Sequence, residues 1–173
     1  LENPQSVHIE DLEAFYQQAK AKSDTDADFA QAARDEVLKL HNHDAGTLTV
    51  WRQIVSESRS HYQPIYDRLS ITLVPEDERG ESFYADQLAD VVQSLKGKGI
   101  AEESEGAVCV FPEGFKNKEG DPLPFIIQKS DGAFLYATTD LAALRFRIEE
   151  LGADKIIYVT DARQALHFAM LFA

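Results

Sequence analysis

Hydrophobic positions in the first part of the chain recur at the three- and four-residue spacing of amphipathic helices. One such pattern covers residues 9–22, a second follows the acidic break at 24–28, and a third begins at Gly46 and Thr47. An acidic or small polar residue ahead of an apolar run is a usual helix start, because its side chain accepts a hydrogen bond from a free N–H group of the first turn. Residues 1–66 are therefore predicted to form a helical lobe.

After this lobe, the pattern changes to short runs rich in β-branched and aromatic residues, which favour strands. Two turn signals separate the runs: Asn117 to Gly120, and the pair Asp131-Gly132, which is typical of a tight hairpin. Residues 67–132 are therefore predicted to form an α+β connecting region with antiparallel hairpins. The predicted strands cover 69–74, 107–111, 125–129 and 133–137, and the predicted helix covers 83–96.

Residues 133–173 carry alternating strand and helix signals. The strand at 133–137 leads into a helix near 140–151, and residues 155–160 form a continuous apolar run, typical of a strand buried on both faces. Another helix is expected after Asp161. This order predicts a βαβ unit with a right-handed crossover, as one truncated half of a catalytic core. The expected fold class is α/β: part of a Rossmann-like doubly wound parallel sheet, with an inserted helical lobe and a small antiparallel β meander.

Composition narrows the class of protein and its compartment. Every apolar run is far shorter than the roughly 18 residues of a membrane-spanning helix, and no secretory signal opens the chain. The single cysteine, Cys109, excludes an internal disulfide and indicates a reducing compartment, so we expect a cytoplasmic protein. The chain begins at Leu1 and its one methionine is Met170, so we expect it to be a piece of a longer protein.

The charge of the chain is negative and uneven. Its net charge of −13 argues against nucleic acid as the main partner of this piece. Residues 133–173 hold four basic and five acidic groups, whereas the remainder holds 13 basic and 25 acidic groups, which gives −1 and −12. This contrast suggests two regions with different roles.

Candidate chemistry lies at the ends of the two strands predicted in the last region. Open α/β sheets bind ligands beyond the carboxyl ends of their strands, here Tyr136 to Asp140 and Thr160 to Gln164. A carboxylate, an amide and a phenol around one cleft suit a planar cation with several N–H donors, such as a guanidinium. The alternative is that Asp140 only caps a helix and Tyr136 belongs to the core.

Several motifs resemble the central catalytic block of the arginyl-tRNA synthetases, a class I family, and they occur in the same order. The resemblance covers about residues 60–173, whereas the helical lobe is similar mainly in length and pattern. The motifs are Tyr66-Asp-Arg-Leu69, Glu81-Ser-Phe-Tyr84, Lys129-Ser-Asp-Gly132, Tyr136-Ala-Thr-Thr-Asp140-Leu-Ala-Ala, and Asp154-Lys-Ile-Ile-Tyr-Val-Thr-Asp161-Ala-Arg-Gln164-Ala-Leu-His167-Phe168.

The resemblance implies an arginine site. In that family the positions matching Tyr136, Asp140 and Gln164 hold the substrate guanidinium, which agrees with the cleft expected above. His167 lies one helical turn beyond Gln164 and is expected to reach the nucleotide side of the cleft; the alternative is a packing residue. The implied substrates and partners of the parent enzyme are L-arginine, ATP with Mg²⁺, and tRNA(Arg).

Two motifs of the family are absent from this chain: the His-x-Gly-His signature and the Lys-Met-Ser-Lys-like loop, which stabilise the ATP phosphates. We therefore expect the chain alone to be inactive, with no bound cofactor. One alternative is a non-catalytic amino-acid-binding or interaction module on the same fold. A class I synthetase for another amino acid explains less, because it does not account for Asp140 together with Gln164.

Other chemistry-bearing residues have simpler readings. His41-Asn-His43-Asp44 resembles a metal cluster but has no further close ligands, so a surface turn is expected. Cys109 alternates with valines in a strand, which predicts a buried, inert thiol. Acidic residues 102, 103 and 105 are expected in a solvated loop, and Lys116, Lys118 and Lys129 on an exposed hairpin.

Overall fold

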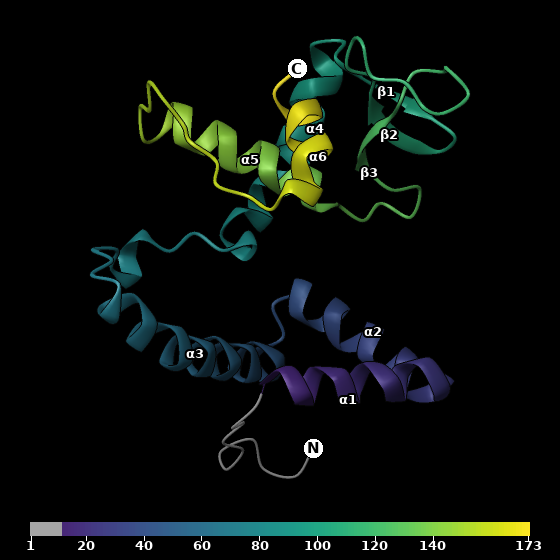
Figure 1. Cartoon of the computed structure of the whole chain (residues 1–173). Coiled ribbons are helices and arrows are strands. Elements are labelled where there is room, and N and C mark those ends of the chain that lie inside the picture. The colour runs from purple at the N-terminus through teal and green to yellow at the C-terminus, as the bar shows by residue number, and fades with distance from the viewer. Residues whose placement is uncertain (1–11) are drawn as a thin grey trace. The chain divides into compact units, whose positions relative to one another are not determined.

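The computed structural model describes residues 12–173 and divides the chain into two compact units, Leu1–Val74 and Pro75–Ala173. Each unit has its own internal packing and is described by itself below (Figure 1). Within the described part, no helix is both long enough and apolar enough to cross a membrane.

The first unit is built from three helices, α1 (Leu12–Thr25), α2 (Ala27–His41) and α3 (Ala45–Arg68). Asp26 and Asp44 precede α2 and α3, and each side chain accepts a hydrogen bond from the backbone N–H three residues on, at 3.0 Å and 2.9 Å. These caps explain where the two helices begin. The three predicted helices are confirmed over the described residues; the start of the first prediction, residues 9–11, lies outside them.

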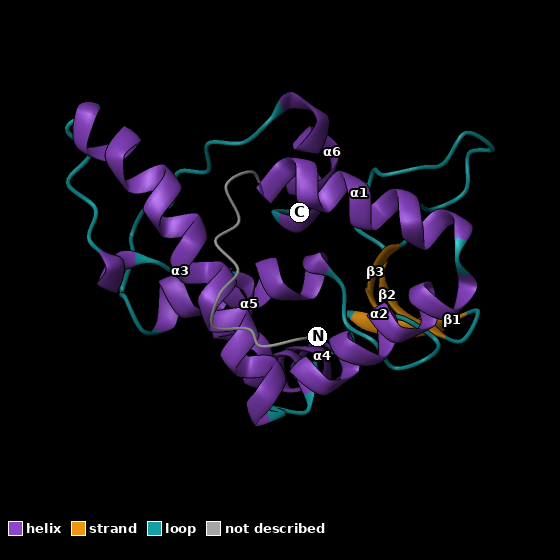
Figure 2. Cartoon of the chain, turned by 90° about the horizontal axis from the view of Figure 1, so that it is seen from below, coloured by secondary structure: helices purple, strands orange, loops and turns teal. Residues whose placement is uncertain are grey.

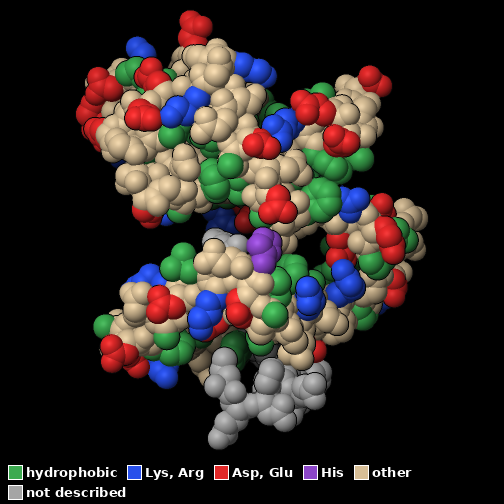
Figure 3. All heavy atoms as spheres, turned by 180° about the vertical axis from the view of Figure 1, so that it is seen from behind, with side chains coloured by type: hydrophobic (Ala, Val, Ile, Leu, Met, Phe, Trp, Pro, Cys, Tyr) green, Lys and Arg blue, Asp and Glu red, His purple; other side chains and the backbone are tan. Residues whose placement is uncertain are grey.

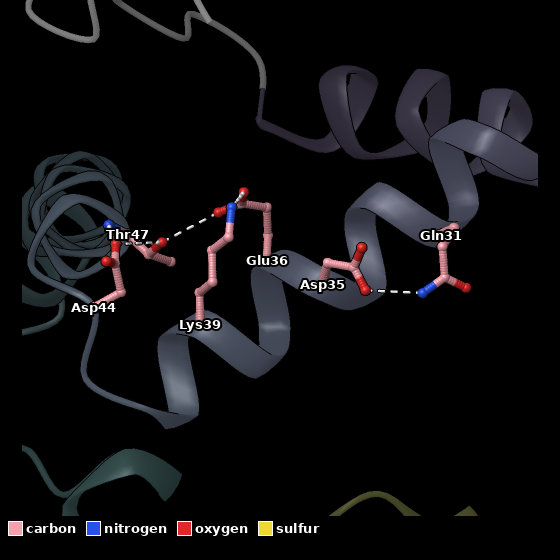
Figure 4. A network of polar contacts seen from close by, with 6 residues as sticks. All are labelled: Gln31, Asp35, Glu36, Lys39, Asp44 and Thr47. Carbon is pink, nitrogen blue, oxygen red and sulfur yellow. Dashed lines mark hydrogen bonds and ion pairs between the residues drawn. The ribbon is translucent and has the colours of Figure 1, made fainter.

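A small polar network joins α2 to the start of α3 (Figure 4). Lys39 Nζ lies 2.6 Å from Glu36 Oε1, and the Thr47 hydroxyl lies 3.1 Å from both Glu36 Oε2 and Asp44 Oδ1. The hydrogen bond from Lys39 is the largest cause that lowers the pKa of Glu36, and the Thr47 backbone N–H is the largest cause that lowers the pKa of Asp44. All of these bonds favour the charged carboxylates.

The second unit packs helices against a three-stranded antiparallel sheet (Figures 1 and 2). Helix α4 contacts strand β1, α5 contacts α4 and β3, and α6 contacts α5. The short 3-10 helices η2 (Pro75–Asp77), η3 (Glu81–Gln87) and η4 (Ala162–Gln164) complete it. The main elements are α4 (Leu88–Gly97), β1 (Ala101–Ser104), β2 (Ala107–Val110), β3 (Phe125–Gln128), α5 (Tyr136–Glu149) and α6 (Ala165–Leu171).

The antiparallel meander predicted from the sequence is confirmed, although its strand set differs. The predicted strands at 107–111 and 125–129 correspond to β2 and β3, which pair with Cys109 opposite Ile126. The third strand is β1, which contains Glu102 and Glu103, so these two residues are not in a loop as predicted. Both side chains are exposed, which lets a charged edge strand face solvent.

Three predicted strands are wrong, and two of them, 69–74 and 133–137, precede and follow the antiparallel sheet along the chain. Residues 69–74 pair with no strand in the described structure and form a turn and an irregular segment after α3. Residues 133–137 contain only one isolated bridge, from Phe134 to Gln128, and Tyr136 already begins α5. The helix predicted near 140–151 is therefore confirmed, but it starts four residues earlier.

The parallel sheet is not present among the described residues. Residues 155–160 form no strand, and Ile157 and Val159 are 73% and 94% exposed. A strand requires a neighbouring strand to pair its N–H and C=O groups, and the β-branched pattern supplies only the side chains. Tyr158 anchors the segment: its hydroxyl accepts a hydrogen bond from Arg147 Nη1 at 2.7 Å, and its ring packs against Phe168.

The core of the second unit lies between the sheet and the helices. Ile127 on β3 is completely buried, as is Thr138 on α5, and Val92 on α4 is 2% exposed. Cys109 is also buried, as predicted, and desolvation raises the pKa of its thiol, which supports the prediction that it is inert.

Candidate functional site

The first turns of α5 and the middle of α6 bring three chemistry-bearing side chains together. Tyr136 and Asp140 are four residues apart on α5, so they lie on the same helix face. His167 reaches this face from α6, with Nε2 2.7 Å from Asp140 Oδ2 and its ring centroid 4.8 Å from that of Tyr136. We call Tyr136, Asp140 and His167 the α5–α6 cluster.

The three side chains of the α5–α6 cluster differ in how far they are exposed to solvent. The side chain of His167 is 12% exposed, that of Asp140 is 31% exposed, and Tyr136 is 61% exposed. An ionised carboxylate can only accept hydrogen bonds, so His167 Nε2 is the donor in the pair. The other carboxylate oxygen, Oδ1, accepts no hydrogen bond from any side chain that the structure describes. A partly desolvated acceptor therefore stands beside an exposed phenol.

The position of the cluster is fixed by the contact between α5 and β3. Thr138 is fully buried, and its hydroxyl donates a hydrogen bond to the Ile127 carbonyl of β3. Leu135 begins the helix in extended backbone without a side-chain cap, and its carbonyl accepts from Thr138 N at 2.9 Å. The first turn of α5 is thus tied to the sheet, and Tyr136 and Asp140 contact His167 of α6.

This geometry argues against the alternative in which Asp140 caps the helix and Tyr136 belongs to the core, while arginine binding by these residues stays a prediction. Asp140 lies in the second turn of α5 and accepts from His167, so it does not cap the helix. Tyr136 is too exposed to be a core residue. The two residues come together through helix periodicity and not, as the sequence suggested, through the end of a parallel strand.

Gln164 is placed differently. It ends η4 and directly precedes α6, three residues before His167, and its side chain is exposed. In the described structure its side chain makes no hydrogen bond with Tyr136 or Asp140. The structure therefore brings Tyr136 and Asp140 together with His167, while Gln164 lies at the neighbouring helix start.

Sequence reasoning missed two contributors. Thr138 carries the buried hydrogen bond that fixes α5. The sequence does not signal this role, because a Thr-Thr pair before an apolar run is also typical of an ordinary helix start. The contact of His167 with Asp140 spans 27 positions of the chain, and nothing in the local pattern signals it. Phe125 on β3 also packs against the His167 ring, with centroids 5.4 Å apart.

The described residues contain no group of three His, Cys, Asp or Glu side chains that could hold a metal ion. His43 lies exposed in the turn before α3, whereas the side chain of His41 is outside the described residues. Acidic and basic side chains are interspersed over the face seen in Figure 3. The α5–α6 cluster is thus the strongest candidate site.

Known proteins match this chain over most of its length. The family described as tRNA synthetases class I (R), catalytic domain, matches residues 2–173. The arginine–tRNA ligase of Crocosphaera subtropica is 53% identical over 96% of this chain and 28% of its own length. That of Stutzerimonas stutzeri is 50% identical over 99% of this chain and 30% of its own length.

Structural similarity leads to the same family. The arginyl-tRNA synthetase from Plasmodium falciparum aligns with a TM-score of 0.73 and 32% identity, over 84% of this chain and 24% of that one. The chain spans less than a third of the length of the curated relatives named here. The motifs that resemble arginyl-tRNA synthetases therefore have support from sequence and from structure, and the chain belongs to the class I tRNA synthetase (R) family, within its catalytic domain.

Proposed function

We propose that this chain supplies the arginine-binding part of an arginine–tRNA ligase. The observation that carries the proposal is the α5–α6 cluster, in which Asp140 keeps one carboxylate oxygen unengaged beside the exposed ring of Tyr136. The names of the relatives add the reaction, and the identity over nearly the whole chain supports the transfer of that name.

The chemistry of the cluster suits a guanidinium. An ionised carboxylate has about four lone-pair sites, and His167 occupies one of them, so Asp140 can still accept N–H groups of a planar cation. The Tyr136 hydroxyl is exposed and can accept a further N–H group. Gln164, at the adjacent start of α6, is proposed as the third arginine contact through its amide oxygen.

The reaction proposed for the whole enzyme has two steps. The arginine carboxylate attacks the α-phosphate of ATP, so that arginyl-adenylate forms and pyrophosphate leaves, with Mg²⁺ accompanying the nucleotide. The terminal ribose hydroxyl of tRNA(Arg) then attacks the arginyl carbonyl and releases AMP. The residues of this chain bind and orient arginine; the phosphate-stabilising motifs named above are not among them.

Two further parts of the proposal concern the nucleotide and the compartment. The nucleotide contact expected of His167 stays a prediction. We also propose that the enzyme works in the cytoplasm, which is supported by a single, buried, unpaired cysteine in the described chain.

The test is the substitution Asp140→Asn in a chimeric ligase, made by replacing the matching segment of the Crocosphaera subtropica enzyme with this chain. Asn keeps the size of the side chain but removes the charge that faces the guanidinium. A charge-assisted hydrogen bond contributes about 1.5–3 kcal/mol, so kcat/KM for arginine should fall at least about tenfold. The KM for ATP should change little, and the preference for arginine over uncharged citrulline should narrow.

The control is Asp154→Asn, which removes an exposed carboxylate outside the cluster and should leave arginine kinetics unchanged. The assay is arginine-dependent pyrophosphate exchange with tRNA present. An inactive chimera contradicts the proposal, and so does unchanged arginine kinetics in the Asp140→Asn enzyme.

A further inference from the structure

The contact between His167 and Asp140 is a hydrogen bond and not only a packing contact. The two side chains meet at 2.7 Å, and the imidazole is the more buried of the two, at 12% exposed. Three aromatic rings surround it: Phe125 at 5.4 Å, Tyr136 at 4.8 Å and Phe168 at 4.9 Å between centroids. The imidazole therefore has little freedom to turn away from the carboxylate.

The hydrogen bond engages one oxygen of the carboxylate. Because an ionised carboxylate accepts at Oδ2, the imidazole donates through an N–H group at Nε2. The other oxygen, Oδ1, is left to accept N–H groups of a guanidinium.

The hydrogen bond also selects an orientation for the carboxylate. Asp140 is partly exposed on a helix surface, so without a partner its terminal torsion would be broadly distributed. With Oδ2 held by His167, Oδ1 is left without a hydrogen bond from any side chain that the structure describes. A binding group whose orientation is fixed before the ligand arrives loses less entropy on binding.

We propose that His167 is a positioning residue for arginine recognition, which holds the Asp140 carboxylate through a hydrogen bond from Nε2 and does not itself touch the nucleotide. This inference rests on the proposed arginine site. It assigns His167 to amino-acid selection, in place of the nucleotide contact predicted from its helical position.

The experiment compares two substitutions in the chimeric ligase. His167→Leu keeps an apolar side chain of similar size among the aromatic rings but removes the donor. His167→Gln is the matched control, because its amide nitrogen can occupy the place of Nε2 and donate to Asp140. We expect His167→Leu to raise the KM for arginine by about tenfold, which is one hydrogen bond to a charged group. His167→Gln should stay within about threefold of the unmodified chimera.

If His167 had a purely structural role, its substitution would lower the melting temperature and the amount of active enzyme. It would not raise the KM for arginine more than the KM for ATP. We therefore expect the KM for ATP to change less than about twofold in both variants. The double variant Asp140→Asn/His167→Leu should have nearly the arginine KM of Asp140→Asn alone, since the role of His167 runs through that carboxylate.

The outcomes separate this inference from the function on which it rests. If Asp140→Asn weakens arginine use while His167→Leu and His167→Gln behave alike, the positioning role is wrong and the arginine site stands. A rise in the KM for ATP with an unchanged KM for arginine overturns the inference in favour of a nucleotide contact. If Asp140→Asn itself leaves arginine kinetics unchanged, both proposals are wrong.

Discussion

Thr138 holds the candidate site in place, although it does not belong to it. It is the one buried polar side chain among the described residues, and its hydroxyl donates to the carbonyl of Ile127, on the central core position of β3. The bond ties the first turn of α5 to the sheet, and Tyr136 and Asp140 lie on that same turn and the next. Thr138, which is not proposed to bind a ligand, thus sets the position of Tyr136 and Asp140, which are.

The substitution Thr138→Val tests this tether. Valine has nearly the same shape but cannot donate, so the Ile127 carbonyl loses a buried hydrogen bond. We expect the free energy of unfolding, measured by urea denaturation of the chain, to fall by about 1–3 kcal/mol. The control is Thr139→Val, the same change at the next position, where no side-chain hydrogen bond is described; it should cost less than about 0.5 kcal/mol. Equal losses would show that the tether has no special role.

At the scale of elements, polar contacts decide where α2 ends and α3 begins. The network of Glu36, Lys39, Asp44 and Thr47 crosses the turn between the two helices, and all four residues are exposed or half-exposed (Figure 4). Exposed ion pairs contribute little individually, because water and salt screen them. The caps at the helix starts contribute through hydrogen bonds to N–H groups that otherwise have no partner in the helix.

This junction should be sensitive to acid. The folded pKa values of Glu36 and Asp44 lie below their ordinary values of 4.5 and 3.8. The two ionised carboxylates therefore stabilise the folded state fully when the pH is above their ordinary pKa values. This stabilisation is lost as the pH falls through the ordinary pKa values to the lower pKa values of the folded state. Acid titration followed by circular dichroism should show helix loss in this range.

The double variant Glu36→Gln/Asp44→Asn removes the two titrating groups and should lose a smaller share of its helicity on acidification. Its matched control is Glu119→Gln/Asp154→Asn, which removes two exposed carboxylates from the second unit and should titrate like the unmodified chain. The same acid response in all three proteins would exclude the junction as its source.

At the scale of the whole molecule, the important property is the share of its relatives' length that the chain covers. It spans less than a third of the relatives it matches, and its β-branched run at 155–160 is largely exposed. It also has neither of the two motifs that stabilise ATP phosphates in this family. We therefore expect that the chain alone does not neutralise the charge that develops on the α-phosphate during attack.

The purified chain should therefore not catalyse arginine-dependent pyrophosphate exchange and should not charge tRNA. The measurement is radiolabelled pyrophosphate exchange into ATP, with tRNA present and with host enzyme removed. The chimeric ligase, assayed at the same concentration, is the positive control. Exchange by the chain that is abolished by Asp140→Asn would show that the phosphate chemistry is supplied within these residues.

Features that depend on neighbours along the chain could be read from the sequence. The caps at Asp26 and Asp44 and the apolar spacing of α1, α2 and α3 act within one helical turn, and these helices were predicted correctly. Strands β2 and β3 were also found, because a turn and alternating side chains fix a local antiparallel pair. The motifs around Tyr136 and Asp140 indicated the family without any knowledge of the fold.

Features that depend on distant partners were decided only by the tertiary structure. Residues 155–160 have the side chains of a buried strand, but no strand forms because the described chain offers no neighbour to complete the hydrogen bonds. Tyr136 and Asp140 lie on one face of α5 and not at a strand end, because α5 already begins at Tyr136 and residues 133–137 have only an isolated bridge to Gln128. His167 meets Asp140 across 27 positions, since only the packing of α6 on α5 brings the imidazole to the carboxylate.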